Sequence, residues 1–433
     1  MTRNLRGILL FGAVALLFVI EGQTVSWNSA LGILNVGLIS AIVALGVNLQ
    51  WGYGGLFNIG VVGFFALGGL APVLVSSPPQ PEAWAAGGPR LIAAFAVAIL
   101  ATALAVYAYG RTRGRLRVAL MLLILVLGFF GYRALFDPAA GAIEQINSST
   151  AGNIGGLGLP VLLAWPVGAV FAAAAAWAIG KIALGLRSDY LAIATLGIGE
   201  IIVAVLKNED WLARGVKNVI GLPRPVPYEV DLQASPAFVA RATGWGLDPV
   251  TASSILVKLC YAGLFLAVLL VLVWLAELAL KSPWGRMMRA IRDNETAAEA
   301  MGKDVTRRHL QLFILGSALC GLAGAMMVTL DGQFTPGTYN PLRFTYVIWL
   351  MVIVGGSGNN WGAVLGSLLI WYLWVKVEPW GHDILAFATS GMADGSAFKQ
   401  HLLDSAAHMR LMTMGVILLL VLRFSPRGLL PEK

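Results

Sequence analysis

The stretch Ser282-Pro-Trp-Gly-Arg-Met-Met-Arg-Ala-Ile-Arg-Asp-Asn-Glu-Thr-Ala-Ala-Glu-Ala-Met-Gly302 carries dense charges of both signs between two apolar runs. Only 12% of the chain is charged, so this segment stands apart from its surroundings. Its arginines recur at every third residue, which places them on one stripe of a helix. Two glutamates spaced four apart then begin a second helical pattern, which the glycine is suited to end. The stretch predicts a short helical hairpin that faces water.

The rest of the chain is strongly apolar. Hydrophobic residues make up 58% of it and the mean hydropathy is +0.78, whereas soluble domains carry about 25% charged residues. In lipid the backbone must satisfy its own hydrogen bonds, which helices do. We therefore predict an all-α integral membrane protein with about twelve transmembrane helices (ten to twelve) in a single domain, 1–433. The apolar runs that predict the spans are 7–20, 30–49, 59–75, 91–109, 118–132, 159–180, 190–206, 259–276, 310–330, 344–358, 361–375 and 411–422.

The lysines and arginines predict how the chain threads the membrane. With a cytoplasmic N-terminus, the inner segments are richer in Lys and Arg than the outer ones, as the positive-inside rule requires. Both termini are then cytoplasmic, as is a loop at 281–308, while 207–258 and 376–410 are periplasmic loops. The stretch 76–158, which holds Arg111, Arg113, Arg115 and Arg117, predicts an accessory insertion with two extra helices. Since topology accounts for the net charge of +8, we expect no nucleic-acid partner.

The N-terminal run has a second interpretation. Arg3 and Arg6 ahead of 7–20 also fit a signal peptide, but no clear A-x-A cleavage site follows. We expect a retained first helix.

Four further motifs lie along the chain. They are Asn48-Leu-Gln-Trp-Gly-Tyr-Gly-Gly-Leu-Phe-Asn-Ile-Gly60, Ser188-Asp-Tyr-Leu-Ala-Ile-Ala-Thr-Leu-Gly-Ile-Gly-Glu-Ile201, Gly355-Gly-Ser-Gly-Asn-Asn-Trp-Gly362 and Arg423-Phe-Ser-Pro-Arg-Gly-Leu-Leu430. With the charged hairpin, they resemble the branched-chain amino acid ABC transporter permeases, in their LivM-like branch, a family that also includes urea and amide permeases. The resemblance runs from 48 to 430 and omits 76–158.

This resemblance implies an ABC importer permease fold and a transport subunit that is not an enzyme. The subunit would move a small polar solute, a branched-chain or other amino acid, by alternating access across the bacterial cytoplasmic (inner) membrane. Its partners would be a second, related permease subunit, two ABC ATPase subunits and a periplasmic solute-binding protein. No cofactor would bind this chain, because ATP and Mg²⁺ belong to the ATPases. Consistently, no G-x-x-x-x-G-K-S/T loop occurs here.

The resemblance also assigns residues to roles. ATPase coupling would rest on the loop residues Pro283, Gly285, Arg286, Arg289, Ala290, Arg292, Asn294, Glu295, Ala297, Ala298, Glu299 and Gly302. Three glycines in Gly52-Tyr-Gly-Gly55 break a helix, and the turn either lines the substrate pathway or is an ordinary turn at the inner face. The residues of the predicted substrate pathway are Asn48, Gly52, Tyr53, Gly54, Gly55, Asn58, Thr195, Gly197, Gly199 and Glu200. Small residues at four-residue spacing permit close helix packing, inside the subunit or at a seam between permeases: Ser317, Gly321, Gly358, Gly362 and Gly366.

Glu200 is the one carboxylate inside a predicted span, near the middle of 190–206. An ionisable group there faces a cavity or a partner, so Glu200 is either a pathway residue or a structural carboxylate bonded to neighbouring helices. It also keeps open a different class of protein, an ion-coupled secondary transporter or channel.

The solute stays open as well. Val61 after Gly60, and Ala213-Arg-Gly-Val-Lys-Asn218, depart from the family pattern and leave a urea or short-amide permease as the alternative. His382, His401 and His408 have unrelated spacings and predict no metal site.

Overall fold

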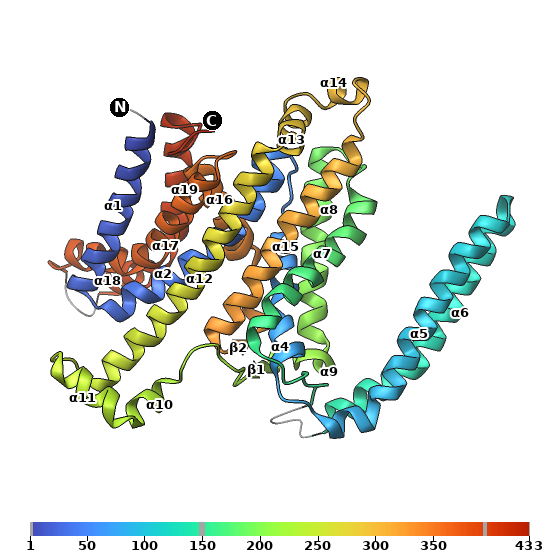
Figure 1. The fold of residues 1–433 in the computed structure, drawn as a ribbon, viewed down its shortest axis with the longest axis horizontal. Helices are drawn as coiled ribbons and strands as arrows, with labels where there is room; N and C mark the ends of the chain where they lie inside the picture. The colour runs from blue at the N-terminus through green and yellow to red at the C-terminus, as the bar shows by residue number, and fades with distance from the viewer. Residues whose placement is uncertain (1–2, 147–151, 393–395, 433) are drawn as a thin grey trace.

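The computed structural model describes residues 3–146, 152–392 and 396–432, which are mostly helical (Figure 1). The elements of the first half are α1 (Arg3–Thr24), α2 (Trp27–Val47), the π-helix η1 (Asn48–Tyr53), α3 (Val61–Gly69), α4 (Ala71–Ser76), α5 (Pro81–Arg111), α6 (Gly114–Glu144), α7 (Val161–Ala183), α8 (Ser188–Asn208), α9 (Asp210–Ala213) and the 3-10 helix η2 (Gly215–Lys217).

The second half begins with β1 (Val219–Ile220), which pairs antiparallel with β2 (Gln333–Phe334). Its other elements are α10 (Glu229–Ala234), α11 (Pro236–Gly244), α12 (Pro249–Lys281), α13 (Pro283–Asp293), α14 (Glu295–Ala300), α15 (Val305–Asp331), η3 (Pro336–Thr338), the π-helix η4 (Leu342–Tyr346), α16 (Val347–Gly355), α17 (Asn360–Ala388), α18 (Ala397–Asp404) and α19 (Ala406–Phe424).

Nine helical segments of the described chain are long and apolar enough to cross a bilayer, namely those of α1, α2 with η1, α5, α6, α7, α8, α12, α15 and α19. This confirms the all-α membrane class. Two further runs that we predicted as spans, 59–75 and 344–358, form the shorter apolar segments Val61–Ser76 and Arg343–Gly355. The run 361–375 lies in α17, which has 29 residues. The count of twelve spans stays a prediction.

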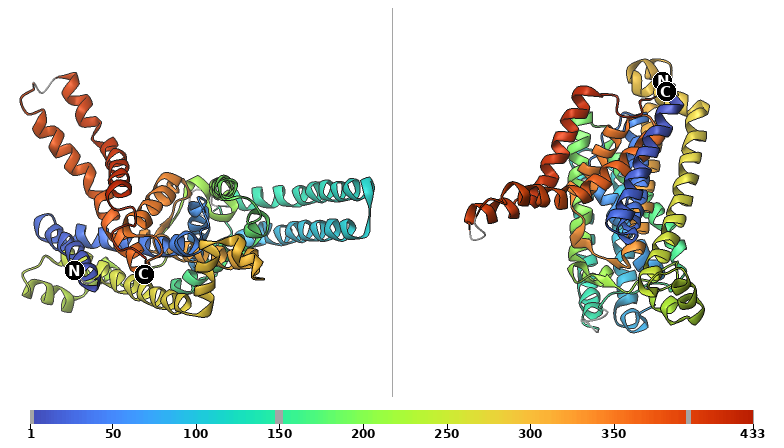
Figure 2. Two further views of the ribbon diagram at one scale, coloured as in Figure 1. Left: turned by 90° about the horizontal axis from the view of Figure 1, so that it is seen from above. Right: turned by 90° about the vertical axis from the view of Figure 1, so that its left-hand side faces the viewer.

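Two helices form the centre of the bundle. In the most apolar 18-residue stretch of each helix, 83% of the residues are buried in α2 with η1 and 72% in α15. In the same stretch of α6, none is buried. The helices α3, α7, α12 and α17 pack around this central pair. Both α13 and α14 lie at one end of the bundle, where α1 begins and α19 ends (Figures 1 and 2).

Glycines bring α3, α7 and α15 unusually close together. A Cβ atom built on Gly168 would lie 2.8 Å from the carbonyl oxygen of Gly68, and one on Gly321 would lie 2.5 Å from that of Gly168. The predicted packing residue Gly321 therefore works inside the subunit. Likewise, a Cβ on Gly362 would lie 2.8 Å from the Gly355 oxygen, and one on Gly366 2.8 Å from the Gly355 nitrogen. These glycines allow the backbones of α16 and α17 to pack in close contact.

The helices α5 and α6 form a long antiparallel hairpin that leans away from the bundle (Figures 1 and 2). Its base is fastened to α9: Trp211 packs edge-on against Phe136, with ring centroids 5.5 Å apart, and its backbone N–H donates to Glu144 at 3.2 Å. These are the two helices of the stretch 76–158. Its status as an accessory insertion stays a prediction.

The prediction that Glu200 is the one carboxylate inside a span is wrong. Glu21 lies in α1, is 2% exposed, and pairs with Lys376 of α17 at 2.8 Å. The helices continue past their apolar runs, because a buried charge is tolerated once it has a partner. Much of 376–410 is helical and not an irregular loop, since it contains the end of α17, α18 and the start of α19.

Candidate functional site at the α13–α14 end

The charged hairpin folds as two short helices with defined ends. Pro283 occupies the first turn of α13, where its missing N–H costs no hydrogen bond. The Asn294 side chain begins α14 by accepting from the Ala297 N–H at 2.9 Å. Gly302 follows α14 with a left-handed φ of 75°, which glycine adopts without strain. The predicted helical hairpin and its closing glycine are confirmed.

One face of α13 is fixed to the bundle. Gly285 and Met288 are buried, and a side chain at Gly285 would collide with the Leu280 backbone at the end of α12. Arg286 and Arg289 donate to the carbonyl oxygens of Lys281 and Leu280, at 3.2 and 3.4 Å. These arginines thus satisfy carbonyls that the end of α12 leaves free. The sequence stripe of arginines holds α13 in place.

Much of the remaining surface of the hairpin is exposed. Most of the predicted coupling residues are exposed, including Arg286 despite its bond to Lys281: Pro283, Arg286, Ala290, Asn294, Glu295, Ala297, Glu299 and Gly302. Ala298 is buried and points inward instead. Sequence reasoning missed Met301, an apolar side chain that is 79% exposed beside these charges. Its flexible side chain is of a kind that can adapt to a contacting surface.

Arg292 links α13 to two distant segments. Its Nη1 donates to the Gly52 carbonyl oxygen and to Glu432 Oε2, the latter at 2.9 Å, while its Nε and Nη2 both bond Asp293 at 3.1 Å. Partial burial lowers the pKa of Arg292, but the bonds and attraction to Glu432 and Asp293 outweigh it, so the pKa lies above its usual value. Arg292 is therefore a permanent cation at this junction.

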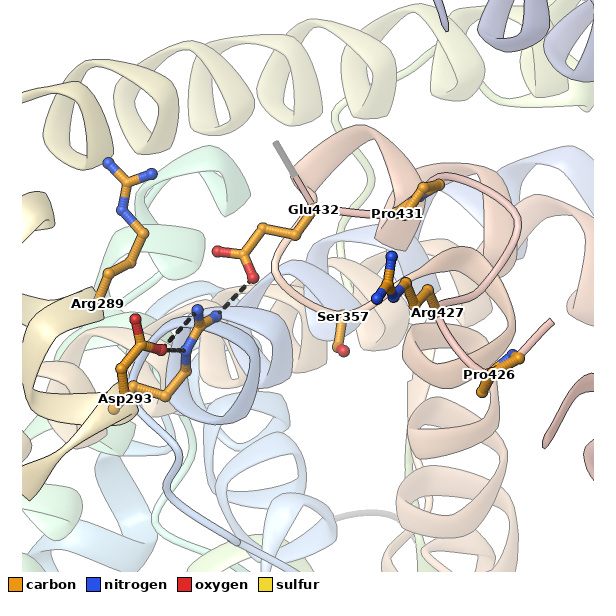
Figure 3. A pocket seen from close by; sticks show the side chains of 8 residues that line it. Arg289, Asp293, Ser357, Pro426, Arg427, Pro431 and Glu432 are labelled. Carbon is orange, nitrogen blue, oxygen red and sulfur yellow. Dashed lines mark hydrogen bonds and ion pairs between the residues drawn. The ribbon is translucent and has the colours of Figure 1, made fainter.

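A polar cavity of about 650 Å³ opens beside this junction. In Figure 3, Arg289 and Asp293 of α13 lie on one side, Ser357 and Arg427 on the other, and Glu432 between them. The cavity thus joins the charged hairpin, the glycine turn after α16 and the segment after α19. Sequence reasoning missed Glu432, because nothing in its local pattern indicates a partner on α13.

The glycine motif after α2 ends the helix in a tight, buried turn. Residues 48–53 form the π-helix η1, a form frequent at functional sites. A Cβ on Gly52 would lie 2.5 Å from the Gly358 nitrogen, and one on Gly54 2.5 Å from Leu312 Cδ1. Gly55 has a left-handed φ of 68°. Tyr53 is buried within the same turn.

Polar side chains near this turn form a buried network. Asn48 Oδ1 accepts from the Gly358 N–H at 2.8 Å, and its Nδ2 donates to Asn360 Oδ1 at 3.1 Å. Asn360 in turn donates to Glu277 of α12 at 3.2 Å. Asn48 and Asn360 are both 0% exposed. The network connects η1, at the end of α2, with α12 and the start of α17.

Gln50, which sequence reasoning also missed, extends the network. Its Nε2 donates to the Phe313 oxygen at 2.9 Å and to Ser317 Oγ at 3.1 Å, and its Oε1 accepts from Asn58 Nδ2 at 2.9 Å. The available signal in the sequence was the position of the Gln50 amide, between the apolar run 30–49 and the glycine turn. Thr195 of α8 completes the chain by accepting from the Ile59 N–H at 3.1 Å.

The remaining predicted pathway residues lie on α8. Gly199 packs against Gly60, with its Cβ position 3.1 Å from the Gly60 Cα. Gly197 and Glu200, by contrast, are exposed on the outer side of the helix. No described residue forms a hydrogen bond or ion pair with Glu200. The alternative of a carboxylate bonded to neighbouring helices therefore finds no support within the described chain.

An apolar pocket of about 400 Å³ lies next to the buried network. Its walls include the aromatic rings of Phe57 and Trp349, whose centroids are 4.6 Å apart. Trp349 Nε1 donates to the Asn58 oxygen at 3.1 Å, and Thr345 Oγ1 accepts from the Val62 N–H at 3.2 Å. The polar atoms of the pocket wall are thus turned toward the protein, which leaves apolar surface for an occupant.

Comparison with known proteins identifies the family of this chain. The profile of the family described as branched-chain amino acid transport system, permease component, matches residues 29–151 and 114–422. The chain is 30% identical over 301 residues to the probable branched-chain amino acid transport permease protein LivM of Methanocaldococcus jannaschii, covering 67% of this chain and 74% of the relative. No solved structure matches significantly.

Two other relatives match over shorter stretches. The high-affinity branched-chain amino acid transport system permease protein LivM of Escherichia coli is 30% identical over 214 residues, 47% of this chain and 48% of that protein. The probable permease LivH of M. jannaschii is 33% identical over 103 residues, 24% of this chain and 32% of the relative. The chain therefore belongs to the branched-chain amino acid transport permease family and is a multi-pass membrane permease subunit of the ABC class, not an enzyme.

Proposed function

We propose that this permease works in an ATP-driven importer that carries a branched-chain or other amino acid by alternating access. The observation that carries the proposal is the bond from Arg292 of α13 to the Gly52 carbonyl. Through it, a water-facing surface fit for a soluble partner is joined to a buried break in a central helix. A push on α13 would move η1, and with it the helices that the polar network connects.

Further hydrogen bonds tie α13 to the bundle. Besides Arg292, Trp284 of α13 donates to Gln311 of α15 at 3.1 Å, and the arginine stripe bonds the end of α12. The short hairpin thus contacts α12, α15 and η1 together. Energetic coupling between sites travels through such contiguous hydrogen bonds and rigid helices.

We place the solute pathway along the exposed side of α8 and the neighbouring apolar pocket. Glu200 is a carboxylate that no described residue bonds, and a lipid environment would make it costly. A facing partner subunit or a water-filled pathway would remove that cost. The apolar walls around Trp349 suit an aliphatic side chain, whereas a carboxylate such as Glu200 suits an ammonium group.

The proposal includes the partners. A related second permease would face α8; that relatives carry the names LivM and LivH supports a pair of permeases. Two ATPases, which bind the ATP and Mg²⁺, would dock on α13 and α14, and a periplasmic binding protein would deliver the solute. The site of action would be the bacterial cytoplasmic membrane.

The test is a pull-down of the tagged permease from gently solubilised native membranes, with mass spectrometry of the co-purifying chains. ATP-dependent uptake of labelled leucine into vesicles of the same membranes follows, with alanine and urea as competing solutes. We expect P-loop ATPases, a second permease and competition by aliphatic amino acids. A homo-oligomer without an ATPase would overturn the proposal and favour ion-coupled transport. If urea alone competed with uptake, the transported solute would be urea or a short amide and not an amino acid.

A further inference from the structure

The tip of the α5–α6 hairpin carries charge that the proposed function does not use. Arg113 lies between the two helices, Arg111 ends α5, and Arg115 and Arg117 lie in the first turn of α6; the first three in sequence, Arg111, Arg113 and Arg115, are exposed. The sequence has no Asp or Glu between Glu82 and Asp137, so no acid on the hairpin's outer part balances them. Figure 1 shows this tip in the half of the molecule that holds α13, α14 and both chain ends.

The hairpin itself is built to stand in lipid. Both helices have 31 residues, about 46 Å at 1.5 Å per residue. Along them, side chains such as Ile92, Ile99, Val106, Leu116, Leu127 and Phe130 are all more than 60% exposed. Beyond its base at Trp211 the hairpin leans away from the bundle (Figure 2). An acyl-chain environment on all sides would place the tip at the level of the headgroups.

Two tip arginines are arranged by aromatic rings. The Arg117 guanidinium carbon lies 3.2 Å from the centroid of the Tyr109 ring, and that of Arg111 lies 5.7 Å from Tyr107. Such stacking leaves the guanidinium edge available, and tyrosine is typical of the membrane interface. The side chains of Arg113 and Arg115 are exposed beside this stacked pair.

We propose that the hairpin tip binds the phosphate groups of acidic phospholipids in the inner leaflet. Guanidinium edges match the paired oxygens of a phosphate, and four cations at one turn favour an acidic lipid over a neutral one. A positive-inside signal requires only charge at the inner side. The stacking of two arginines on tyrosine rings is a geometry that a topology signal does not need.

The experiment compares photoactivatable phosphatidylglycerol with photoactivatable phosphatidylcholine, at equal mole fractions, in vesicles holding the full chain. The readout is the share of lipid adducts that map to 107–118. We expect the acidic lipid to give at least about fivefold more tip adducts, with a preference that falls as salt rises. Equal labelling by the two lipids, or tip cross-links to a protein chain instead, would overturn the proposal.

Variants sharpen the comparison. Gln at 111, 113, 115 and 117 should abolish the preference at the tip. A matched variant removes four exposed cations elsewhere, with Gln at Lys181, Arg187, Arg307 and Arg423, and should leave it intact. If both variants lose the preference equally, bulk charge and not a site is responsible. The unmodified chain decides the question by itself should the tip variant fail to insert.

Discussion

Arg292 Nη1 donates to the carbonyl oxygen of Gly52, and this bond joins the water-facing helix α13 to the π-helix that ends α2. The same guanidinium holds Glu432 at 2.9 Å. A side chain on Gly52 would collide with Asn48 and with the Gly358 nitrogen, so Gly52 packs directly against the buried network. The Arg292 guanidinium therefore links the exposed helix α13 to the buried π-helix η1 inside the bundle.

This relationship predicts an uncoupled variant. In Arg292→Gln the Gly52 carbonyl loses its charged donor, a contribution of about 1.5–3 kcal/mol. If that bond transmits the ATPase's work, transport should fall at least about tenfold while ATP hydrolysis continues. Uptake and ATPase activity are measured in the same vesicles.

Arg307→Gln is the matched control, because Arg307 is exposed at the start of α15 and its side chain bonds no described residue. It should leave both activities unchanged. Equal loss of transport in both variants, or undiminished transport in Arg292→Gln, would contradict the role of the Arg292–Gly52 bond.

The glycine contacts predict where volume is not tolerated. Gly321→Val would press on the Gly168 backbone of α7, and overpacking of this kind costs about 1–3 kcal/mol or more. We expect a lower thermal midpoint in detergent. Gly263→Val on α12, where a Cβ would meet nothing within 4 Å, should be tolerated. Equal midpoints for the two variants would mean that α7 and α15 do not pack through these glycines.

The apolar runs and glycine motifs were enough to predict the helical class, the water-facing hairpin and the glycine turns. Each rests on local pattern: period, caps and positive φ. What could not be predicted depends on partners far apart in the sequence. Gln50 contacts Ser317, Arg292 contacts Glu432, and Glu21 contacts Lys376 only in the assembled bundle. The last pair also lets α1 and α17 extend beyond their apolar runs.

The Glu21–Lys376 pair predicts a strong asymmetry between single and double substitution. Lys376→Met leaves the Glu21 carboxylate buried and unpaired, which costs about 3–5 kcal/mol. Adding Glu21→Leu should recover much of the lost thermal midpoint. Lys217→Met is the control: Lys217 pairs with Asp210 at 2.7 Å but is 49% exposed, so its loss should cost about 0–1 kcal/mol. A double variant no more stable than Lys376→Met would contradict the prediction.

Glu200 should matter for transport and not for the fold. It is exposed and bonds no described residue, so Glu200→Gln should change stability by no more than about 0.5 kcal/mol. Transport should fall, because the carboxylate would face the solute or the partner permease. Glu82→Gln, an exposed carboxylate at the start of α5, serves as the control. A lower thermal midpoint with normal uptake would instead make Glu200 structural.

Met301 predicts how the ATPase is held. The side chain is 79% exposed at the end of α14, among residues that face water. Burying a methionine side chain contributes about 1.5–3 kcal/mol, so Met301→Glu should weaken co-purification of the ATPase at least about tenfold. Thr306→Glu adds the same charge at an exposed position nearby on α15 and should have little effect. If both variants retain the ATPase equally, the partner docks elsewhere on the hairpin and the exposed methionine takes no part in it.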